Sequence, residues 1–142
     1  MITGKMARIA LVVLEAFLGV TAVIGGVGLL LGWEKAPVSQ LQGSPFGSYL
    51  IPGLALMVLV GGSAIVAAAA VWRGQKFGAL ASAVSAAMIL GFEVVEYAVI
   101  GYQSGLQVFY VLVGFAILAL AAPALIGRLR MKAPPRGAGR VR

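Results

Sequence analysis

Four long, almost uninterrupted runs of apolar residues constrain the fold of this chain more than any other feature of its sequence. They cover residues 9–31, 49–72, 77–100 and 106–126. Each run reaches the roughly 20 residues that an α-helix needs to cross a bilayer. A membrane barrel is a poor alternative, because its strands alternate apolar and polar residues whereas these runs are continuously apolar and rich in Ala, Leu and Gly. The pattern predicts an all-α, polytopic membrane protein, built as a bundle of four transmembrane helices.

The composition agrees with a membrane protein and excludes several kinds of chemistry. Of the 142 residues, 61% are hydrophobic and 11% are charged, against about 45–50% and 25% in soluble domains. The chain contains no Cys and no His. This rules out thiol redox chemistry, catalysis by a His base, and zinc or haem sites built on these side chains. We expect no cofactor, no metal site and no catalytic residue.

The apolar runs leave no room for a separate soluble domain. We expect residues 1–127 to form the transmembrane domain and residues 128–142 to form a basic, disordered tail. The first run is longer than the apolar core of a signal peptide and carries Glu15, so we interpret it as a retained span. Ser44 and Pro45 predict a short helical turn before the second span. Pro123 is expected to kink or end the fourth helix.

The positive charges are distributed unevenly along the chain. Ten of the eleven Lys and Arg residues lie before the first run, between the second and third, or after the fourth. With four crossings these regions share one side, which the positive-inside rule identifies as cytoplasmic. We therefore expect both termini in the cytoplasm and the bundle in a bacterial inner membrane.

The basic tail is expected to contact lipid and not nucleic acid. Arg128, Arg130 and Lys132 follow the fourth run directly, and each charge near an anionic leaflet contributes about 1 kcal/mol. A nucleic-acid role would require a stacking platform or a folded binding module, and neither is visible in the sequence. The expected partners are the bilayer and its anionic headgroups.

Three of the four acidic residues lie inside predicted spans. An ionised side chain at a helix centre costs roughly 2.5–3.5 kcal/mol on insertion scales. Glu93 and Glu96 lie one turn apart on a helix face that also carries Tyr97, while Glu15 lies at a different depth, in the first helix. We identify Glu15, Glu93, Glu96 and Tyr97 as a candidate proton or cation site, in which Glu93 and Glu96 could share one proton.

A structural interpretation of the same acids remains open. Glu93 and Glu96 are close enough to the outer boundary to meet water, with Tyr97 and Tyr102 as hydrogen-bond partners. Glu15 could reach towards the cytoplasmic surface or be protonated. In that case the acids form a polar network without a transport role.

Glycines mark the surfaces where helices are expected to approach closely. Small residues allow close backbone contact between helices in a membrane. The candidates for helix packing are Gly19, Gly26, Gly61, Gly62 and Gly91.

Three segments carry a resemblance to known proteins. They are LQGSPFGSYLIPGL at 41–54, VEYAVIGY at 95–102 and LQVFY at 106–110. With these segments the chain resembles a group of small bacterial four-span membrane proteins of unassigned function, over nearly its whole length. The resemblance implies the four-span topology and brings no activity or cofactor. A looser similarity to the small multidrug transporters rests on one feature, the glutamate at position 15 in the first of four short helices.

Two functions stay open at this point. The chain is expected to be a structural or accessory component of the inner membrane, as a homo-oligomer or within a larger assembly. The alternative is a proton- or cation-coupled transporter of small molecules that uses the intramembrane glutamates. An enzyme is third, since no nucleophile, metal site or phosphate-binding loop accompanies the acids.

Overall fold

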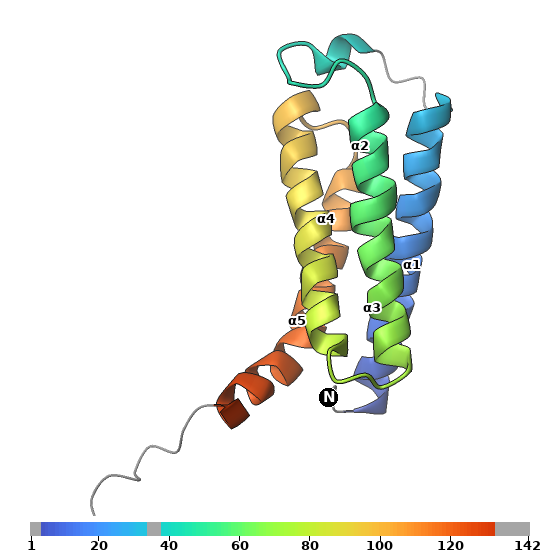
Figure 1. The fold of residues 1–142 in the computed structure, drawn as a ribbon. Coiled ribbons are helices and arrows are strands. Elements are labelled where there is room, and N and C mark those ends of the chain that lie inside the picture. Colours follow the sequence, from blue (N-terminus) through green and yellow to red (C-terminus); the bar gives the residue numbers. More distant parts are fainter. Residues whose placement is uncertain (1–3, 34–37, 133–142) are drawn as a thin grey trace, which may run out of the picture.

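A computed structural model describes residues 4–33 and 38–132 of the chain, and these residues form helices joined by short loops (Figure 1). The elements are α1 (Lys5–Leu31), the 3₁₀ helix η1 (Val38–Leu41), α2 (Leu50–Leu54), the π-helix η2 (Ala55–Gly62), α3 (Ser63–Trp72), α4 (Gly78–Ile100) and α5 (Gly105–Lys132). Because α2, η2 and α3 follow one another without a break, the described residues contain four helices that are long and apolar enough to cross a membrane. The prediction of an all-helical chain with four such helices is confirmed for this part of the chain.

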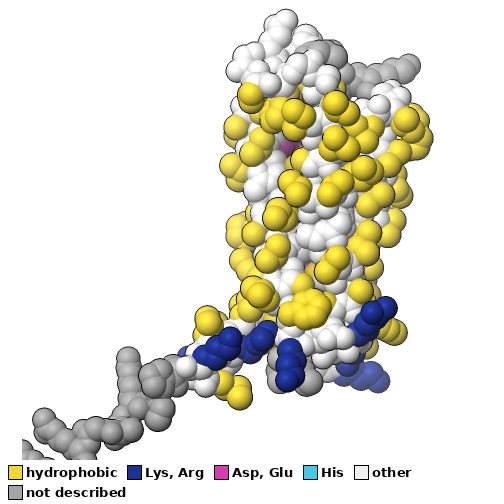
Figure 2. Space-filling model, in the orientation of Figure 1, with side chains coloured by type: hydrophobic (Ala, Val, Ile, Leu, Met, Phe, Trp, Pro, Cys, Tyr) yellow, Lys and Arg dark blue, Asp and Glu magenta, His cyan; other side chains and the backbone are white. Residues whose placement is uncertain are grey.

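The four long helices pack side by side as a bundle (Figure 1). Helix α1 packs against the continuous helix 50–72 and against α5, while α4 packs against α3 and α5. The core between them contains fully buried Leu11 and Leu18 from α1, Ile89 from α4 and Ile117 from α5. Hydrophobic side chains also cover the outside of the bundle along its length (Figure 2). An apolar exterior around a packed interior is what a bundle in lipid requires.

Glycines allow α1 to pack very closely against the helix 50–72. A Cβ atom on Gly26 would lie 2.6 Å from Cβ of Met57, and one on Gly61 would lie 2.8 Å from Cγ2 of Val23. A Cβ on Gly19 would lie 2.7 Å from Cγ1 of Ile65. Gly19, Gly26 and Gly61 therefore lie at a helix contact that has no room for a side chain.

The expectation for Gly62 and Gly91 is corrected by the structure. A Cβ atom on either residue would meet no atom within 4 Å. Gly62 points away from the contact that its neighbour Gly61 makes, since adjacent helix positions face different directions. Gly91 borders an open space between helices, which is described below.

At one end of the bundle, two arginines donate hydrogen bonds to backbone carbonyls. Several other basic residues also lie near this end, and the full set is Lys5, Arg8, Arg73, Lys76, Arg128, Arg130 and Lys132. Lys and Arg side chains gather there in Figure 2. Arg8 Nε donates a hydrogen bond of 3.1 Å to the Val71 carbonyl, and Arg8 Nη2 donates to the Trp72 carbonyl. Arg128 Nη1 donates to the carbonyl of Lys76. The last carbonyl groups of a helix lack hydrogen-bond partners within the helix. These contacts therefore provide donors for carbonyl groups at the end of α3 and in the turn that follows.

Three local expectations are corrected by the structure, wholly or in part. No helical turn begins at Ser44; instead its Oγ donates to the Leu41 carbonyl at 2.7 Å and accepts from the Phe46 amide at 3.2 Å, which closes a turn after η1. Of the two outcomes expected at Pro123, the end of the helix is wrong: α5 continues to Lys132 and leaves the bundle at an angle, as a kinked helix does (Figure 1). The expected disordered tail is therefore helical over 128–132, and residues 133–142 lie outside the described part.

Candidate functional site

Glu15 lies in the centre of the bundle and not at its surface. Its side chain is fully buried, and Oε2 accepts a hydrogen bond of 2.6 Å from Oγ of Ser85 on α4. Leu11 and Leu18, one turn before and after it on the same face of α1, are also fully buried. The expectation that Glu15 reaches towards the cytoplasmic surface is therefore wrong. Its carboxyl group joins α1 to α4 across the core.

Two serines of α4 surround this carboxyl group. Ser82 and Ser85 are both fully buried, and Ser82 lies one turn before Ser85 on the same face of α4. Oε1 of Glu15 and Oγ of Ser82 are buried without a hydrogen-bond partner among the described residues. A buried polar atom without a partner costs about 1–3 kcal/mol, so this polar cluster of Glu15, Ser82 and Ser85 has unused hydrogen-bonding capacity.

A second polar group lies nearer the other end of α4. Glu93 is almost fully buried, and its Oε2 has no hydrogen-bond partner within the described chain. Glu96 is half-buried, and its Oε1 accepts a hydrogen bond of 3.2 Å from Nε2 of Gln107 on α5. Gln107 also donates to the Gly101 carbonyl at 3.2 Å and accepts from the Gln103 amide at 2.8 Å. Gln107 is thus held in a position where it orients the Glu96 carboxylate.

Tyr97 does not belong to this group. Its side chain is 62% exposed, as is that of Tyr102. At 100° per residue, Tyr97 lies about 40° from Glu93 around the helix axis but about 100° from Glu96, and the neighbouring helices leave it uncovered. The structure therefore brings Glu93 and Glu96 together and leaves Tyr97 on the outside.

The two polar groups are separated along the bundle. Ser85, which marks the level of Glu15, precedes Glu93 by eight residues of α4, or about 12 Å at 1.5 Å per residue. Buried Ile89 lies between them on the same face. Within the described residues, no three acids come together as a site for a metal ion.

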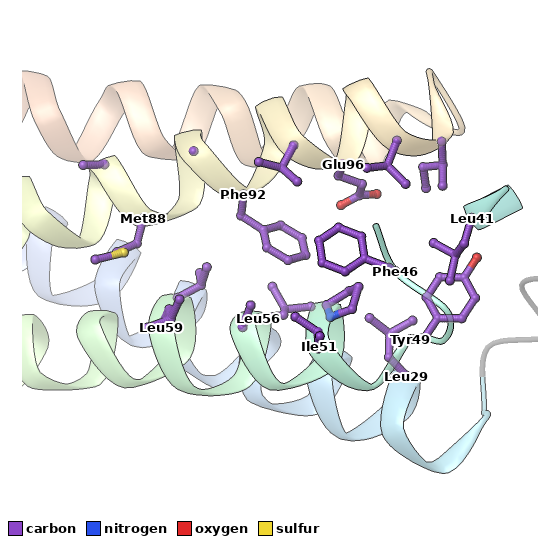
Figure 3. A pocket seen from close by; sticks show the side chains of 18 residues that line it. Leu29, Leu41, Phe46, Tyr49, Ile51, Leu56, Leu59, Met88, Phe92 and Glu96 are labelled. Carbon is purple, nitrogen blue, oxygen red and sulfur yellow. The ribbon is translucent and has the colours of Figure 1, made fainter. Parts of the chain in front are cut away.

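A cavity of about 440 Å³ lies between the α2 and η2 segments and α4 (Figure 3). Leu56 and Leu59 line it from η2, and Met88 and Phe92 line it from α4. Side chains from the loop before α2 also line it, among them Phe46 and Tyr49. Glu96 is the charged side chain among the described lining residues, and Figure 3 shows its carboxylate pointing from α4 towards Phe46.

Ser85, Gln107 and the π-helix are the parts of this site that sequence reasoning missed. Ser85 lies one turn after Ser82 on the face that leads to Glu93, and Gln107 is a polar residue inside the fourth apolar run. Both positions were therefore visible as signals. The sequence contains no comparable signal for the π-helical geometry of Ala55–Gly62.

Comparison of the chain with protein-family models, with curated proteins and with solved structures finds no match in any of the three. The resemblance to small four-span membrane proteins therefore stays a prediction from the sequence.

Proposed function

We propose that this chain is a multi-pass protein of the bacterial inner membrane that acts as a structural or accessory component of a membrane assembly and catalyses no reaction. In this proposal both termini lie in the cytoplasm. The gathering of Lys and Arg at one end of the bundle supports this orientation, because positive charges favour the cytoplasmic side.

The main observation that supports this accessory role is the closed environment of Glu15. The carboxyl group that most suggested transport is buried in a packed core and hydrogen-bonded to Ser85. Its neighbours Leu11, Leu18 and Ile89 are fully or almost fully buried. In this arrangement the group contributes to the contact between α1 and α4, which is a structural role.

The last turns of α5 support contact with lipid headgroups. Leu129 and Met131 are 69% and 88% exposed, and Arg130 and Lys132 alternate with them. A segment of this kind can place apolar side chains among the acyl chains and basic ones among anionic headgroups. Because Arg128 already donates to the Lys76 carbonyl, Arg130 and Lys132 are the stronger candidates for headgroup contact.

Photo-crosslinking in native membranes tests the accessory role. A photoreactive amino acid at Leu112 or Phe115, both exposed on α5, should trap one specific larger membrane protein. The same amino acid at the fully buried Ile117 should trap none. Crosslinks only between copies of this chain would contradict the proposal.

Coupled transport is a second candidate, and a specific observation favours it. Glu15 Oε1 and Glu93 Oε2 are both buried in the bundle without a hydrogen-bond partner in the described structure. Buried acids in membrane helices commonly mark the paths of protons and ions. Two such sites at different depths could bind a proton or cation in turn if the helices between them move.

Flux through liposomes tests this candidate. If the chain is a transporter, purified protein should move protons or a cation, and Glu15→Gln or Glu93→Gln should reduce that flux to the background rate. Ser63→Ala is a matched control, because Ser63 Oγ donates only within its own helix, to the Val60 carbonyl, and this variant should retain the wild-type rate. Absence of flux from the wild-type protein, across ions and common drugs, would exclude the transporter.

A further inference from the structure

We propose that the cavity between the helix 50–72 and α4 holds one acyl chain of a bilayer phospholipid. The phospholipid belongs to the leaflet on the side of the loop before α2, and its chain runs along the cavity towards the middle of the membrane. This binding site goes beyond the proposed function and depends on neither the accessory role nor coupled transport.

The cavity has about the depth of one leaflet. On α4 its lining residues extend from Ala87, near the middle of the helix, to Ile100 at its end, or about 20 Å at 1.5 Å per residue. The hydrocarbon core of a bilayer is about 30 Å thick, so each leaflet contributes about 15 Å. A phospholipid chain of that leaflet therefore lies beside the cavity over most of its length.

Exposed side chains border the cavity on the outside of the bundle. Four residues both line the cavity and are exposed, and they are Ile51, Leu59, Met88 and Val95. They belong to helices that are long and apolar enough to cross a membrane, where lipid surrounds the exposed side chains. The cavity is therefore reached from the bilayer, between the two helices.

The loop before α2 covers one end of the cavity, where Leu41, Phe46 and Tyr49 line it (Figure 3). The Ser44 hydroxyl fixes this turn through its hydrogen bonds to the Leu41 carbonyl and the Phe46 amide. Tyr49 Oη donates to Oε1 of Gln40 at 3.4 Å. Leu41 is almost fully buried although it lies outside the four long helices. A loop held in this way separates the cavity from water at the membrane surface.

The walls of the cavity select a hydrocarbon chain. Apolar side chains such as Leu56 and Phe92 offer few hydrogen bonds to water, and side chains beside a void lose dispersion contacts. Hydrocarbon supplies those contacts without the cost of burying polar groups. The carboxylate of Glu96 is not needed as a partner for the ligand, because it already accepts a hydrogen bond from Gln107.

The volume of the cavity favours a single chain over a helix of a partner protein. A helix with its side chains is at least about 10 Å across, so a space of about 440 Å³ holds only about one turn of it. Spread over a length of about 20 Å, the same volume has a cross-section of about 22 Å², which admits one hydrocarbon chain, since non-bonded carbon atoms lie about 3.5–4.0 Å apart.

Photo-crosslinking of the full chain in phosphatidylcholine nanodiscs tests the proposal. A small share of the phosphatidylcholine carries a diazirine in one acyl chain. This lipid should label peptides of α2, η2 and α4 more strongly than peptides around Leu112 and Phe115, which are exposed on α5 and do not line the cavity. A diazirine-bearing free fatty acid of the same chain length distinguishes the source of the chain. Equal labelling of the two regions by the phospholipid, or labelling of the cavity by the fatty acid alone, would overturn the proposal.

Variants that fill the cavity should remove the excess labelling. Gly91→Leu and Ala55→Leu each place a larger side chain in the cavity, from α4 and from η2, and each should lower labelling to the level of the α5 peptides. Gly62→Leu is the matched control, because Gly62 does not line the cavity and a Cβ there would meet no atom within 4 Å. It should keep the excess. Wild-type labelling in both filled variants would contradict the proposal, and the two regions of the wild-type protein decide the question if a variant fails to fold.

A photoreactive amino acid in place of Met88 distinguishes the possible occupants. Met88 lines the cavity and is exposed at its opening. Crosslinked peptides should carry the mass of a phospholipid. Crosslinks to a second copy of this chain or to another protein in place of lipid would show that the proposal is wrong.

Discussion

A Gly26→Ala variant should be destabilised by about 3 kcal/mol, although alanine is the better helix former. The added Cβ atom would lie 2.6 Å from Cβ of Met57 and 2.7 Å from the carbonyl oxygen of Gly53. The second of these atoms belongs to the backbone, so it cannot move aside as a flexible side chain would. Helix α1 and the helix 50–72 would have to separate, which would loosen packing along their contact.

The matched variant is Gly62→Ala, in which the same methyl group meets no atom within 4 Å. Since alanine favours a helix by about 1 kcal/mol over glycine, this variant should be as stable as the wild type or more stable. Denaturant unfolding of both proteins in one detergent, followed by far-ultraviolet circular dichroism, measures the difference. Equal stabilities for the two variants would show that the close contact at Gly26 does not determine the packing of these helices.

Replacing Glu15 by alanine should cost about 3 kcal/mol of stability, whereas replacing it by glutamine should cost less than about 1 kcal/mol. The alanine variant loses the acceptor for Ser85 and leaves a void in a core where the neighbouring Leu11 and Leu18 are fully buried. Glutamine has nearly the same shape and can still accept from Ser85. Its amide group can also donate to Oγ of Ser82, which has no partner in the described structure.

Unfolding of the two Glu15 variants in the same detergent checks this prediction, with Ser85→Ala as the complementary change. Ser85→Ala removes the hydrogen-bond donor to Oε2 and should cost about 1–3 kcal/mol. If glutamine is as damaging as alanine at position 15, the negative charge itself is required, which would favour a bound cation over a structural contact. The experiment therefore also weighs the accessory role against coupled transport.

The helices could be predicted from the sequence because lipid offers no hydrogen-bond partners to the backbone. A long apolar run in a bilayer has to satisfy its own hydrogen bonds, so it forms a helix. The ends of the helices were less predictable. Helix α1 begins at Lys5 and α5 ends at Lys132, in both cases beyond the apolar run, because hydropathy marks the membrane and not the last hydrogen-bonded turn.

The candidate site could be predicted only in part, and the reason lies in how side chains face their neighbours. Glu15, Glu93 and Glu96 were visible as acids in apolar surroundings. Ser85 gave a weak signal, since serine is common in membrane helices and its role depends on the carboxyl group of another helix. Tyr97 was misplaced because the sequence shows which residues share a helix face and not where the neighbouring helices stop covering it.

The cavity could not be predicted, because its volume depends on the distance between two helices. Gly91 was expected at a close contact and instead borders this space. A glycine permits close approach without enforcing it. The local π-helical geometry of Ala55–Gly62 further changes which side chains face α4.

The hydrogen bond between Ser85 and Glu15 also has a consequence for the biosynthesis of the protein. The two residues are 70 positions apart in the chain, so the first helix is synthesised well before the third. Until the third helix arrives, the acid lacks the partner it has in the finished bundle. An ionised acid costs roughly 2.5–3.5 kcal/mol at the centre of an inserting helix, and the apolar residues around Glu15 have to offset that cost during insertion. Arrival of α4 is then the step that gives the carboxyl group its hydrogen bond and completes the interior.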